Sequence, residues 1–404
     1  MNALLGPLEL GPIAHGGHVV ARHEGRVVFV RGGLPGEQVL VELTDTRHDR
    51  FWKGRVHQVL EASPGRVEQE LPPAAYAGSD FAFASLEAQR RLKAQVIAEQ
   101  LARLGGVDAE VEVEAVPGDR DGWGWRTRMR YLHAGGRVGL RGFHSSELVE
   151  APPGTGFLLA DPRGPAPADL ARYAARAGRE ITVTVADSGV SVMSDGRVLS
   201  GEPVVTQQVR GMDFRVRADG FWQVHPGAAD ALTGAVLDAL GVREGERALD
   251  LYCGVGLFAG ALARAGARVT GMEMDGPAVR LARSNVPQAR FIASRLEQGL
   301  TRLGERSDVV VLDPPRSGAG RRVIEAIAGL SARCIGYVAC DPAALGRDVA
   351  RLRALGYELA SVRAFDIFPM THHVETVALL SREKSLDRPG SVRPARTGGR
   401  GAVS

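Results

Sequence analysis

The feature that most constrains the fold is a regular alternation of apolar runs and helix-period segments downstream of Gln208. The apolar runs ERALDLYCG, ARVTGMEM, DVVVLDPP and CIGYVACDP have the composition of strands, and a last one, VETVALLSR, ends the pattern. Segments with helix period separate them, among them AADALTGAVLDALG, LFAGALARAG and PAVRLARSNV. This alternation predicts a doubly wound, Rossmann-like α/β domain with a parallel sheet over residues 209–384, with ligands at the C-terminal ends of the strands.

The residues before this domain are β-rich and predict two further units. In residues 1–62, VVFVRGGLPGEQVLVEL alternates apolar and polar residues around a turn with glycine and proline. It predicts a small OB-like β-barrel, a fold that commonly binds RNA. Residues 63–208 contain a helix-period segment, Phe81–Leu104, that Gly105 and Gly106 end, and then a second β-rich stretch. A multidomain protein with a central β-rich α+β lobe is therefore expected.

Composition limits the partners and the compartment. The apolar fraction of 44% and the charged fraction of 24% are typical of globular proteins, and the net charge of +3 permits a polyanionic partner without requiring one. No apolar run reaches about 18 residues, and MNALLGPLEL does not have the pattern of a signal peptide. We expect a cytoplasmic protein without a membrane partner. Residues 385–404, rich in Gly, Pro, Arg and Ser, predict a disordered tail.

The three cysteines are predicted to act singly. Cys253, Cys334 and Cys340 are far from any Cys-x-x-Cys spacing, so we expect neither a disulfide framework nor a zinc or iron–sulfur site. No other metal site is predicted. Cys340 ends an apolar run and is followed at once by Asp-Pro. At that edge of the sheet a cysteine faces the ligand crevice, which makes Cys340 a candidate for chemistry rather than for packing.

The first strand of the α/β domain leads into a glycine turn. Asp250 ends the strand, and Gly254 and Gly256 form the turn, where the backbone can approach a ligand closely. Glu273 ends the next strand and is placed to accept hydrogen bonds from two ribose hydroxyls. Since Ala259 stands where a dinucleotide-binding turn has its third glycine, this order of residues favours adenosyl-methionine over NAD. A structural turn beside a solvated acid is the alternative.

Two later segments add polar candidate residues. Asp313 ends a strand and precedes two prolines that stiffen the turn, an arrangement that recurs in methyltransferases acting on nucleic-acid bases. Arg316 then either orients a base or phosphate or is a surface arginine. In FPMTHHVET, Glu375 lies where the chain re-enters the sheet, and we expect the adjacent His372 and His373 to be solvated loop residues.

Together these motifs carry a resemblance to a known family. The segments FWQVHPG, LDLYCGVGLF, MEMD, VLDPPRSG, YVACDPAALGRD and FPMTHHVETV occur in the order and approximate spacing of the RNA uridine-5 methyltransferases. The segment VVFVRGGLPGE resembles a TRAM domain, so the resemblance covers about residues 9–384. It implies that residues 1–62 are a TRAM RNA-binding barrel and that residues 209–384 are a class I methyltransferase domain dependent on S-adenosyl-methionine.

The resemblance also implies a mechanism. Because C5 of uracil is too electron-poor to attack a sulfonium methyl group, enzymes of this family first add a cysteine thiolate to C6, and a base later removes the C5 proton. By the match, Cys340 is the nucleophile and Glu375 is the base. The residues expected to bind the cofactor are Gln223, Tyr252, Gly254, Gly256, Glu273 and Asp313.

The chain departs from the family pattern at several places. Many members carry a four-cysteine cluster where this chain has LPPAAYAGSDFAFAS, so no iron–sulfur cluster is expected. Ala339 and Asp341 flank the cysteine where serine and asparagine are usual, and His225 stands where asparagine is more usual. A carboxylate beside a thiolate raises the pKa of the thiol by repulsion. We therefore expect Asp341 to raise the pKa of Cys340 and to slow the reaction.

The function expected from the sequence is formation of 5-methyluridine in structured RNA, either tRNA or rRNA, by a monomeric enzyme. The barrel and the central lobe would bind the RNA, and the target base would flip out of its stack to reach Cys340. One alternative is an RNA-binding protein of the same fold with lost or weak activity, and another is an RNA cytosine-5 methyltransferase. The second is disfavoured because those enzymes carry Pro-Cys at the position of this chain's Asp-Pro-Pro. A NAD-dependent oxidoreductase leaves Cys340 unexplained.

Overall fold

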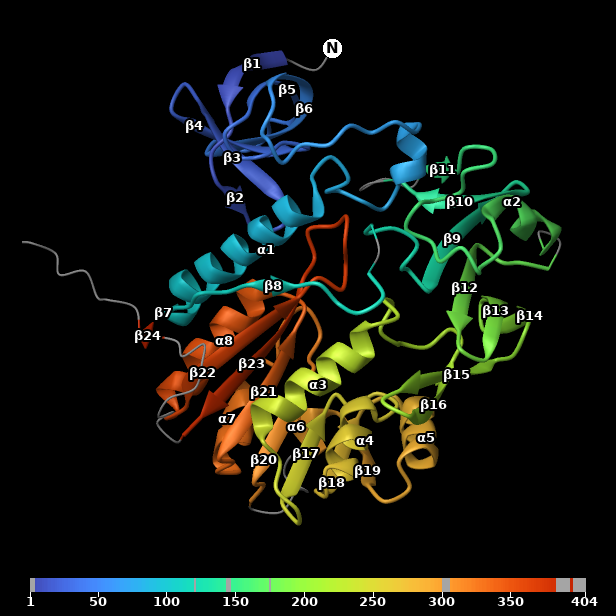
Figure 1. The fold of residues 1–404 in the computed structure, drawn as a ribbon, viewed down its shortest axis with the longest axis vertical. Helices are drawn as coiled ribbons and strands as arrows, with labels where there is room; N and C mark the ends of the chain where they lie inside the picture. Colours follow the sequence, from blue (N-terminus) through green and yellow to red (C-terminus); the bar gives the residue numbers. More distant parts are fainter. Residues whose placement is uncertain are drawn as a thin grey trace, which may run out of the picture.

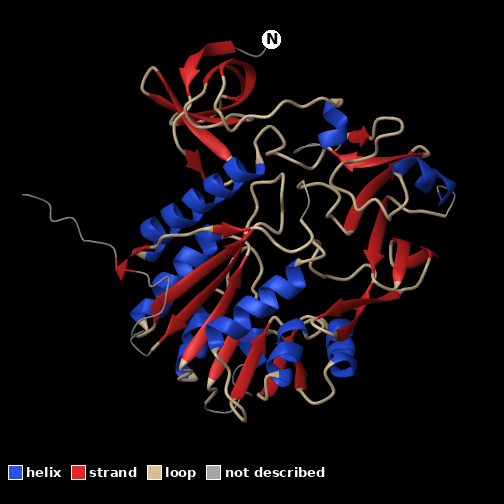
Figure 2. Ribbon diagram, in the orientation of Figure 1, coloured by secondary structure: helices blue, strands red, loops and turns tan. Residues whose placement is uncertain are grey.

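The computed structural model shows three parts arranged around a common centre, with the barrel at the top, the central lobe at the upper right and the α/β domain below (Figure 1). Most helices lie in the α/β domain, and the other two parts consist mainly of strands and loops (Figure 2). Among the residues described, no helix has the length and apolar character needed to cross a membrane. The structure describes residues 4–119, 121–142, 147–173, 176–299, 306–382 and 393–394.

The N-terminal part is a six-stranded sheet that curls around its own core. The strand order is β1-β5-β6-β4-β3-β2, and contacts between β1 and β3 bring its two ends together. Alternate side chains such as Val19, Val28 and Val39 are fully buried, as the period-2 pattern predicts. The strands are β1 (Leu4–Glu9), β2 (Ile13–Ala14), β3 (His18–His23), β4 (Arg26–Arg31), β5 (Gln38–Asp45) and β6 (Phe51–Glu61).

A long helix, α1 (Leu86–Gln100), lies between the barrel and the α/β domain and contacts both (Figure 1). It begins five residues later than the sequence predicts, because Ser85 accepts a hydrogen bond from the helix and caps it. Phe81 instead donates its N–H to the carbonyl of Met370. The helix continues as a π-turn, Leu101–Gly105, and ends as predicted at the left-handed Gly106.

The central lobe is an antiparallel sheet with the order β11-β10-β9-β12-β13-β14. A two-stranded hairpin, β15 and β16, follows it and packs on α5 of the α/β domain. The elements of this lobe and the segment before it are η1 (Pro73–Tyr76), β7 (Val107–Asp108), β8 (Val113–Glu114), β9 (Arg128–Ala134), β10 (Arg137–Arg141), β11 (Leu148–Glu150), α2 (Pro167–Leu170), η3 (Ala171–Tyr173), β12 (Glu180–Ala186), β13 (Gly189–Ser194), β14 (Arg197–Ser200), β15 (Val204–Val209) and β16 (Met212–Arg217).

The α/β domain contains an eight-stranded sheet with the order β19-β18-β17-β20-β21-β23-β22-β8. Its strands are β17 (Arg247–Leu251), β18 (Arg268–Glu273), β19 (Arg290–Ala293), β20 (Val309–Leu312), β21 (Cys334–Ala339), β22 (Glu358–Phe365) and β23 (Glu375–Ser381), with β8 as the eighth. Its helices are α3 (Ala228–Leu240), α4 (Leu257–Arg264), α5 (Gly276–Asn285), α6 (Leu296–Gly299), α7 (Arg321–Gly329) and α8 (Pro342–Ala354).

The sheet differs from the predicted one at one side. Strands β19 to β21 are parallel as predicted, but β23 runs antiparallel to both β21 and β22. The chain reaches β23 from β22 by a loop without a crossover helix, so a parallel pairing was not available. In addition β8, which precedes the central lobe in sequence, pairs with β22 and extends the sheet. The antiparallel β23 therefore starts at the edge where β20 and β21 end.

The middle of this sheet is buried on both faces. All four residues of β20 and all six of β21 are buried, and they contribute to hydrophobic clusters on both sides of the sheet. Full burial of one such side chain contributes about 1.5–3 kcal/mol. The sheet therefore gives a stable base for the polar groups at its edge. The predicted disordered tail lies outside the described residues, except for β24 (Arg393–Pro394), which pairs with β7.

Candidate active site

The glycine turn joins β17 to α4 in a left-handed backbone conformation. Tyr252, Gly254 and Gly256 have φ angles of 60°, 53° and 92°. A Cβ on Gly254 would meet no atom within 4 Å, so its positive φ rather than crowding favours glycine there. Asp250 lies within β17, fully buried, and accepts a hydrogen bond at 2.7 Å from the N–H of Ala259. It therefore holds the start of α4, and burial raises its pKa well above the usual value.

Glu273 ends β18 beside this turn. Its carboxylate accepts backbone N–H groups of Gly254, Met274 and Asp275 at 3.2, 2.7 and 2.8 Å. Since a carboxylate has about four lone-pair sites, the side chain is fixed in place and still has capacity to accept from a hydroxyl. The predicted placement of an acid at the end of the second strand is confirmed.

A cavity of about 560 Å³ connects this turn to the next strand ends. Gly256 is the one predicted site residue that does not line it, because Gly256 lies at the N-cap of α4. Arg126, Phe221 and Phe368 also line the cavity, and the sequence prediction missed their role. The predicted residues that the structure brings together around it are Gln223, Tyr252, Gly254, Glu273, Asp313, Cys340 and Glu375.

Three ionisable groups meet at the sheet edge below the cavity. Asp313 follows β20, Cys340 follows β21, and Glu375 begins the adjacent antiparallel β23. Burial raises the pKa of Asp313 to about 7 and, together with repulsion from Asp313, raises that of Glu375 well above its usual value. In the described part of the chain Glu375 Oε1 is buried without a hydrogen-bond partner. This edge therefore holds protons at neutral pH.

The thiol of Cys340 also keeps its proton. Burial, followed by repulsion from Glu375 and Asp313, raises its pKa to about 12, and the nearby guanidinium of Arg316 opposes the shift. Asp341 raises this pKa as expected, but its contribution is smaller than those of the other two carboxylates. In the resting protein Cys340 is therefore a thiol, and formation of the thiolate requires a further stabilising group.

The small influence of Asp341 on its neighbour has a structural reason. Its carboxylate caps α8 by accepting the N–H of Ala344 at 2.7 Å, and it lies 3.1 Å from Nε2 of His15 in the barrel. Although burial opposes the effect, the hydrogen bonds from His15 and Ala344 lower the pKa of Asp341. A cavity of about 190 Å³ lies between this barrel loop and Cys340. The carboxylate that departs from the family pattern thus joins the barrel loop to the start of α8, directly after β21.

The expectation that His372 and His373 are solvated is wrong. The imidazole of His372 is bound to Asp80, whose carboxylate also accepts the backbone N–H of His372 at 2.9 Å. Nε2 of His373 accepts from Arg316 at 3.3 Å, and burial, followed by repulsion from His372 and Arg316, lowers the pKa of His373 to about 3. These histidines are half-buried, and their hydrogen bonds fix the loop before β23.

His225 stabilises the loop that carries Gln223. It is buried, its Nδ1 accepts the N–H of Gly227 at 3.1 Å, and its ring stacks on Trp125 with 6.0 Å between centroids. Burial lowers its pKa to about 4, so the ring is neutral at physiological pH. It holds the loop that carries Gln223, which is 8% exposed and faces the cavity. Sequence periodicity gave no signal for Gln223, because the residue lies in irregular backbone.

A cavity beside a glycine turn, at the C-terminal strand ends of an α/β sheet, is the ligand position of nucleotide-cofactor-binding α/β domains, among them those of adenosyl-methionine-dependent methyltransferases. Comparison with family models agrees. Residues 294–383 match the tRNA (Uracil-5-)-methyltransferase model, residues 226–331 match the Methyltransferase small domain, and residues 8–56 match the TRAM domain.

Two relatives cover almost the whole chain. An RNA methyltransferase of Streptomyces avermitilis described as uncharacterized is 43% identical, over 92% of this chain and 97% of its own length. A similarly described protein of Corynebacterium efficiens is 37% identical, over 94% and 95%. The chain therefore belongs to the RNA (uracil-5-)-methyltransferase family with an N-terminal TRAM domain, and S-adenosyl-methionine is its cofactor.

A solved structure has the same architecture. The tRNA (uracil-54, C5)-methyltransferase of Pyrococcus abyssi, in complex with S-adenosyl-L-homocysteine, aligns with a TM-score of 0.68 at 22% identity. The alignment covers 92% of this chain and 99% of that one. It confirms the predicted multidomain fold, from the barrel through the central lobe to the α/β domain.

Proposed function

We propose that this enzyme methylates C5 of a uridine in structured RNA, tRNA or rRNA, by covalent catalysis through Cys340. The observation that carries the proposal is the meeting of Cys340, Asp313 and Glu375 at one sheet edge, in the cavity that the glycine turn also lines. A nucleophile and a base are both needed for this reaction, and both line a space large enough for a nucleobase beside a cofactor.

The cavity fits the cofactor. Glu273 keeps acceptor capacity for a ribose hydroxyl, and Gly254 exposes backbone to the same space. Gln223, Tyr252 and Asp313 line the remaining walls, and we assign them to cofactor binding together with Gly254 and Glu273. Gly256 does not line the cavity, and we assign it to the shape of the turn that presents these residues. When bound, adenosyl-methionine supplies a methyl group on a positively charged sulfur.

Two residues of the chain carry out the other steps of the proposed reaction, Cys340 as nucleophile and Glu375 as base. The Cys340 thiol and the Glu375 carboxyl group each first give up a proton to solvent. The Sγ thiolate of Cys340 then forms a bond to C6 of uracil, and the electron pair of the C5–C6 double bond moves toward C5 and its neighbouring carbonyl. After C5 has gained the methyl group, the carboxylate of Glu375 removes the C5 proton. The electron pair of that C–H bond re-forms the double bond, and Cys340 leaves as thiolate. The thiolate takes up a proton from solvent and Glu375 keeps the proton from C5, which restores the resting enzyme with net release of one proton.

Binding of RNA also falls to the other two parts of the chain. We assign RNA binding to the TRAM barrel, residues 1–62, and to the central region, residues 63–208, and chemistry to residues 209–384. The barrel loop with His15 lies against Asp341, so RNA held on the barrel is close to the catalytic strand. The target uridine must leave its stack to enter the cavity.

One experiment tests the proposal. Wild type and Cys340→Ala are incubated with radiolabelled adenosyl-methionine and total RNA that lacks 5-methyluridine, and the RNA is digested to nucleosides. We expect label in 5-methyluridine with wild type and none with Cys340→Ala. Cys334→Ala is the matched control, because Cys334 lies at the opposite end of the same strand. Label in 5-methylcytidine, or equal labelling by Cys340→Ala, would contradict the proposal.

A further inference from the structure

A second cavity of about 430 Å³ adjoins the catalytic one and is formed by the central lobe. Residues of β9, β10 and β12 line it on one side, and the segment before Gln223 lines it on the other. Its volume is within the range of about 300–1,000 Å³ that is usual for ligand pockets. The residues that line both cavities are Arg126, Gly220, Phe221, Trp222 and Val224. A chain molecule can therefore extend from one cavity into the other.

Arg126 lies at the boundary between the two cavities, and its Nε donates to the carbonyl of Arg128 at 3.3 Å. Among residues 4–119, 121–142, 147–173, 176–299 and 306–382, no carboxylate forms an ion pair with it. Burial, followed by repulsion from Arg316, lowers its pKa. A partly buried guanidinium beside another cation is costly unless an anion joins it.

Arginines outnumber acidic residues around the second cavity. Arg126, Arg128, Arg130 and Arg141 line it beside one carboxylate, that of Asp219. Arg130 is exposed, and Arg141 forms an ion pair with Glu180 at 3.6 Å. Arg128 donates to the carbonyls of Gly220 and, at 3.1 Å, of Arg217. It therefore holds the segment that forms the boundary, while Arg126 faces the space on both sides. The anion that fits a planar guanidinium here is a phosphate.

An aromatic side chain completes the boundary. Phe221 is 76% exposed, although the next residue, Trp222, is 7% exposed and anchors the backbone. Because Phe221 lines both cavities, its ring offers a stacking surface to a nucleobase at the passage between them. Stacking of one base on an aromatic side chain contributes about 1–3 kcal/mol in single-stranded nucleic-acid complexes.

We propose that the central-lobe cavity holds the nucleotide adjacent to the target uridine, with Arg126 bound to the phosphate that joins the two nucleotides and Phe221 stacked on a base at the passage. This inference rests on the proposed function, since it takes the catalytic cavity as the uridine site. In this proposal the central lobe binds a single, extended RNA strand. A base-paired duplex is too wide for a pocket of this size.

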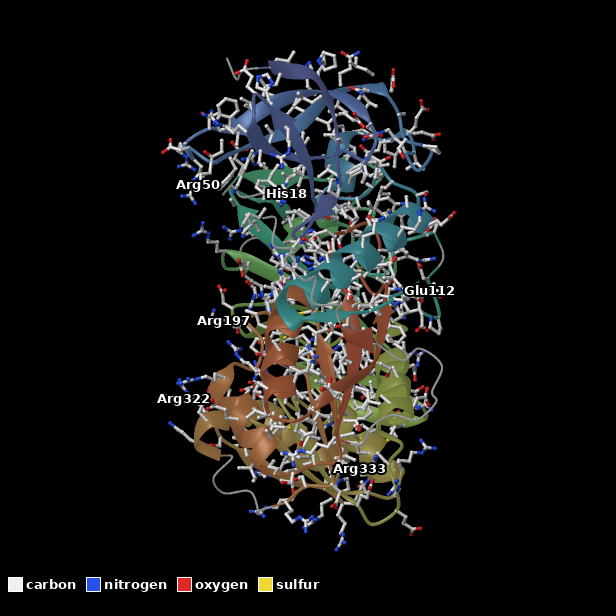
Figure 3. All side chains as sticks on the ribbon, turned by 90° about the vertical axis from the view of Figure 1, so that its left-hand side faces the viewer. His18, Arg50, Glu112, Arg197, Arg322 and Arg333 are labelled. Carbon is white, nitrogen blue, oxygen red and sulfur yellow. The ribbon has the colours of Figure 1, made fainter. Side chains whose placement is uncertain are left out.

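The test measures binding of a single-stranded oligouridylate of about 12 nucleotides as a function of salt concentration. We expect Arg126→Gln to weaken binding about 10-fold and to reduce the slope of log K against log salt by about 0.7, the value for one lost phosphate contact on a single strand. Arg126→Lys keeps the charge and should keep most of the slope. Arg197→Gln is the matched control, because Arg197 is on the same lobe but at the edge of the molecule (Figure 3).

Two results would overturn the inference. The first is wild-type affinity and slope in Arg126→Gln, and the second is an equal loss in Arg126→Lys, which would show a structural rather than an electrostatic role. Circular dichroism melting of each variant checks that it is folded. A failure of the proposed function would give a different result from both of these outcomes. Wild type would then not methylate RNA, whatever the effect of Arg126→Gln on oligouridylate binding.

Discussion

The floor and the wall of the catalytic cavity have opposite electrostatic character. The floor, formed by the sheet edge, carries Asp313, Cys340 and Glu375, whose pKa values are all raised, so that it holds protons. The wall toward the central lobe carries Arg126, which has no carboxylate partner in the described chain. The difference teaches that one cavity can combine two environments, a proton-holding one where carboxyl groups and a thiol are buried together and a cationic one where an arginine has no acidic partner among the described residues. In the proposed function the first serves the chemistry at Cys340 and Glu375, and the second serves binding of the RNA strand.

The largest effect is expected for Glu375→Gln at the floor. The variant keeps Cys340 and so can add to the base, but it cannot remove the C5 proton, and turnover should fall about 10²–10⁴-fold. A covalent protein–RNA complex that survives denaturing electrophoresis should accumulate. Glu358→Gln is the control, since Glu358 is exposed at the far end of the sheet. Loss of turnover without a trapped complex would assign Glu375 to binding instead.

The raised pKa of Cys340 predicts how fast its thiol is alkylated at different pH values. With its pKa at about 12, the free Cys340 thiol should be alkylated slowly at neutral pH. Because the thiolate is the reacting species, the rate should rise about tenfold per pH unit. The measurement is the rate of iodoacetamide modification at Cys340, followed by mass spectrometry. A plateau above about pH 8.5, as for an ordinary thiol, would show that the floor does not hold the proton.

The buried carboxyl group of Asp313 should also reduce the free energy of unfolding at neutral and higher pH. The pKa of Asp313 is raised from its ordinary value to about 7 by burial, so the folded state binds this proton more tightly than the unfolded state. Stability is therefore lost as pH rises from about 4 to about 7, and Asp313→Asn should increase the free energy of unfolding by about 1–3 kcal/mol at pH 8 but not at acid pH. Urea denaturation at several pH values measures it.

Asp308 provides the control for this prediction, because it precedes the same strand β20 at its opposite end. Hydrogen bonds from Arg247 lower the pKa of Asp308 to about 2. The ionised carboxylate of Asp308 therefore stabilises the folded state at pH values above its ordinary pKa. This stabilisation is lost as the pH falls toward about 2 and the carboxylate becomes protonated. Asp308→Asn should therefore destabilise the protein at neutral pH, the opposite sign to Asp313→Asn. If both substitutions changed the free energy of unfolding in the same direction at neutral pH, the proposed difference between the two ends of β20 would be wrong.

The smallest effect is expected for Asp341→Asn, which restores the residue usual in the family. Since this carboxylate is bound by the N–H of Ala344 and lies against His15, its removal should change kcat by less than about threefold. The pH–rate profile of the variant measures it. A gain of tenfold or more would show that repulsion by Asp341 limits the reaction, as the sequence alone suggested.

Much of the catalytic floor could be predicted from the sequence, because parallel strands bring their C-terminal ends to one edge. The places of Asp313 and Cys340 after neighbouring strands follow from that rule. Glu375 begins β23, so its place at the same edge depends on the antiparallel direction of that strand, which the predicted parallel sheet does not contain. The motif FPMTHHVET indicated its role through the family resemblance alone. The order of acid, glycine turn and second acid likewise predicted the side of the cavity that Glu273 occupies.

Other features could not be predicted in this way. The antiparallel direction of β23 depends on pairing between segments that periodicity does not order, and the late start of α1 depends on the cap by Ser85. The fixed position of the half-buried His372 depends on its hydrogen bond with Asp80, which is 292 residues away in the chain. Each of these was set by a partner distant in sequence or by a single hydrogen bond.

The sequence by itself determined the fold class, the family and the places of Asp313 and Cys340 at the ends of neighbouring strands, because strand periodicity and short motifs are local properties of the chain. Only the tertiary structure decided how those groups ionise and what faces them. The proton on Cys340, the use of Asp341 as a cap and the position of Arg126 between two cavities all follow from burial and from neighbours contributed by other parts of the chain. Desolvation and charge interactions act through space, and no local pattern records them.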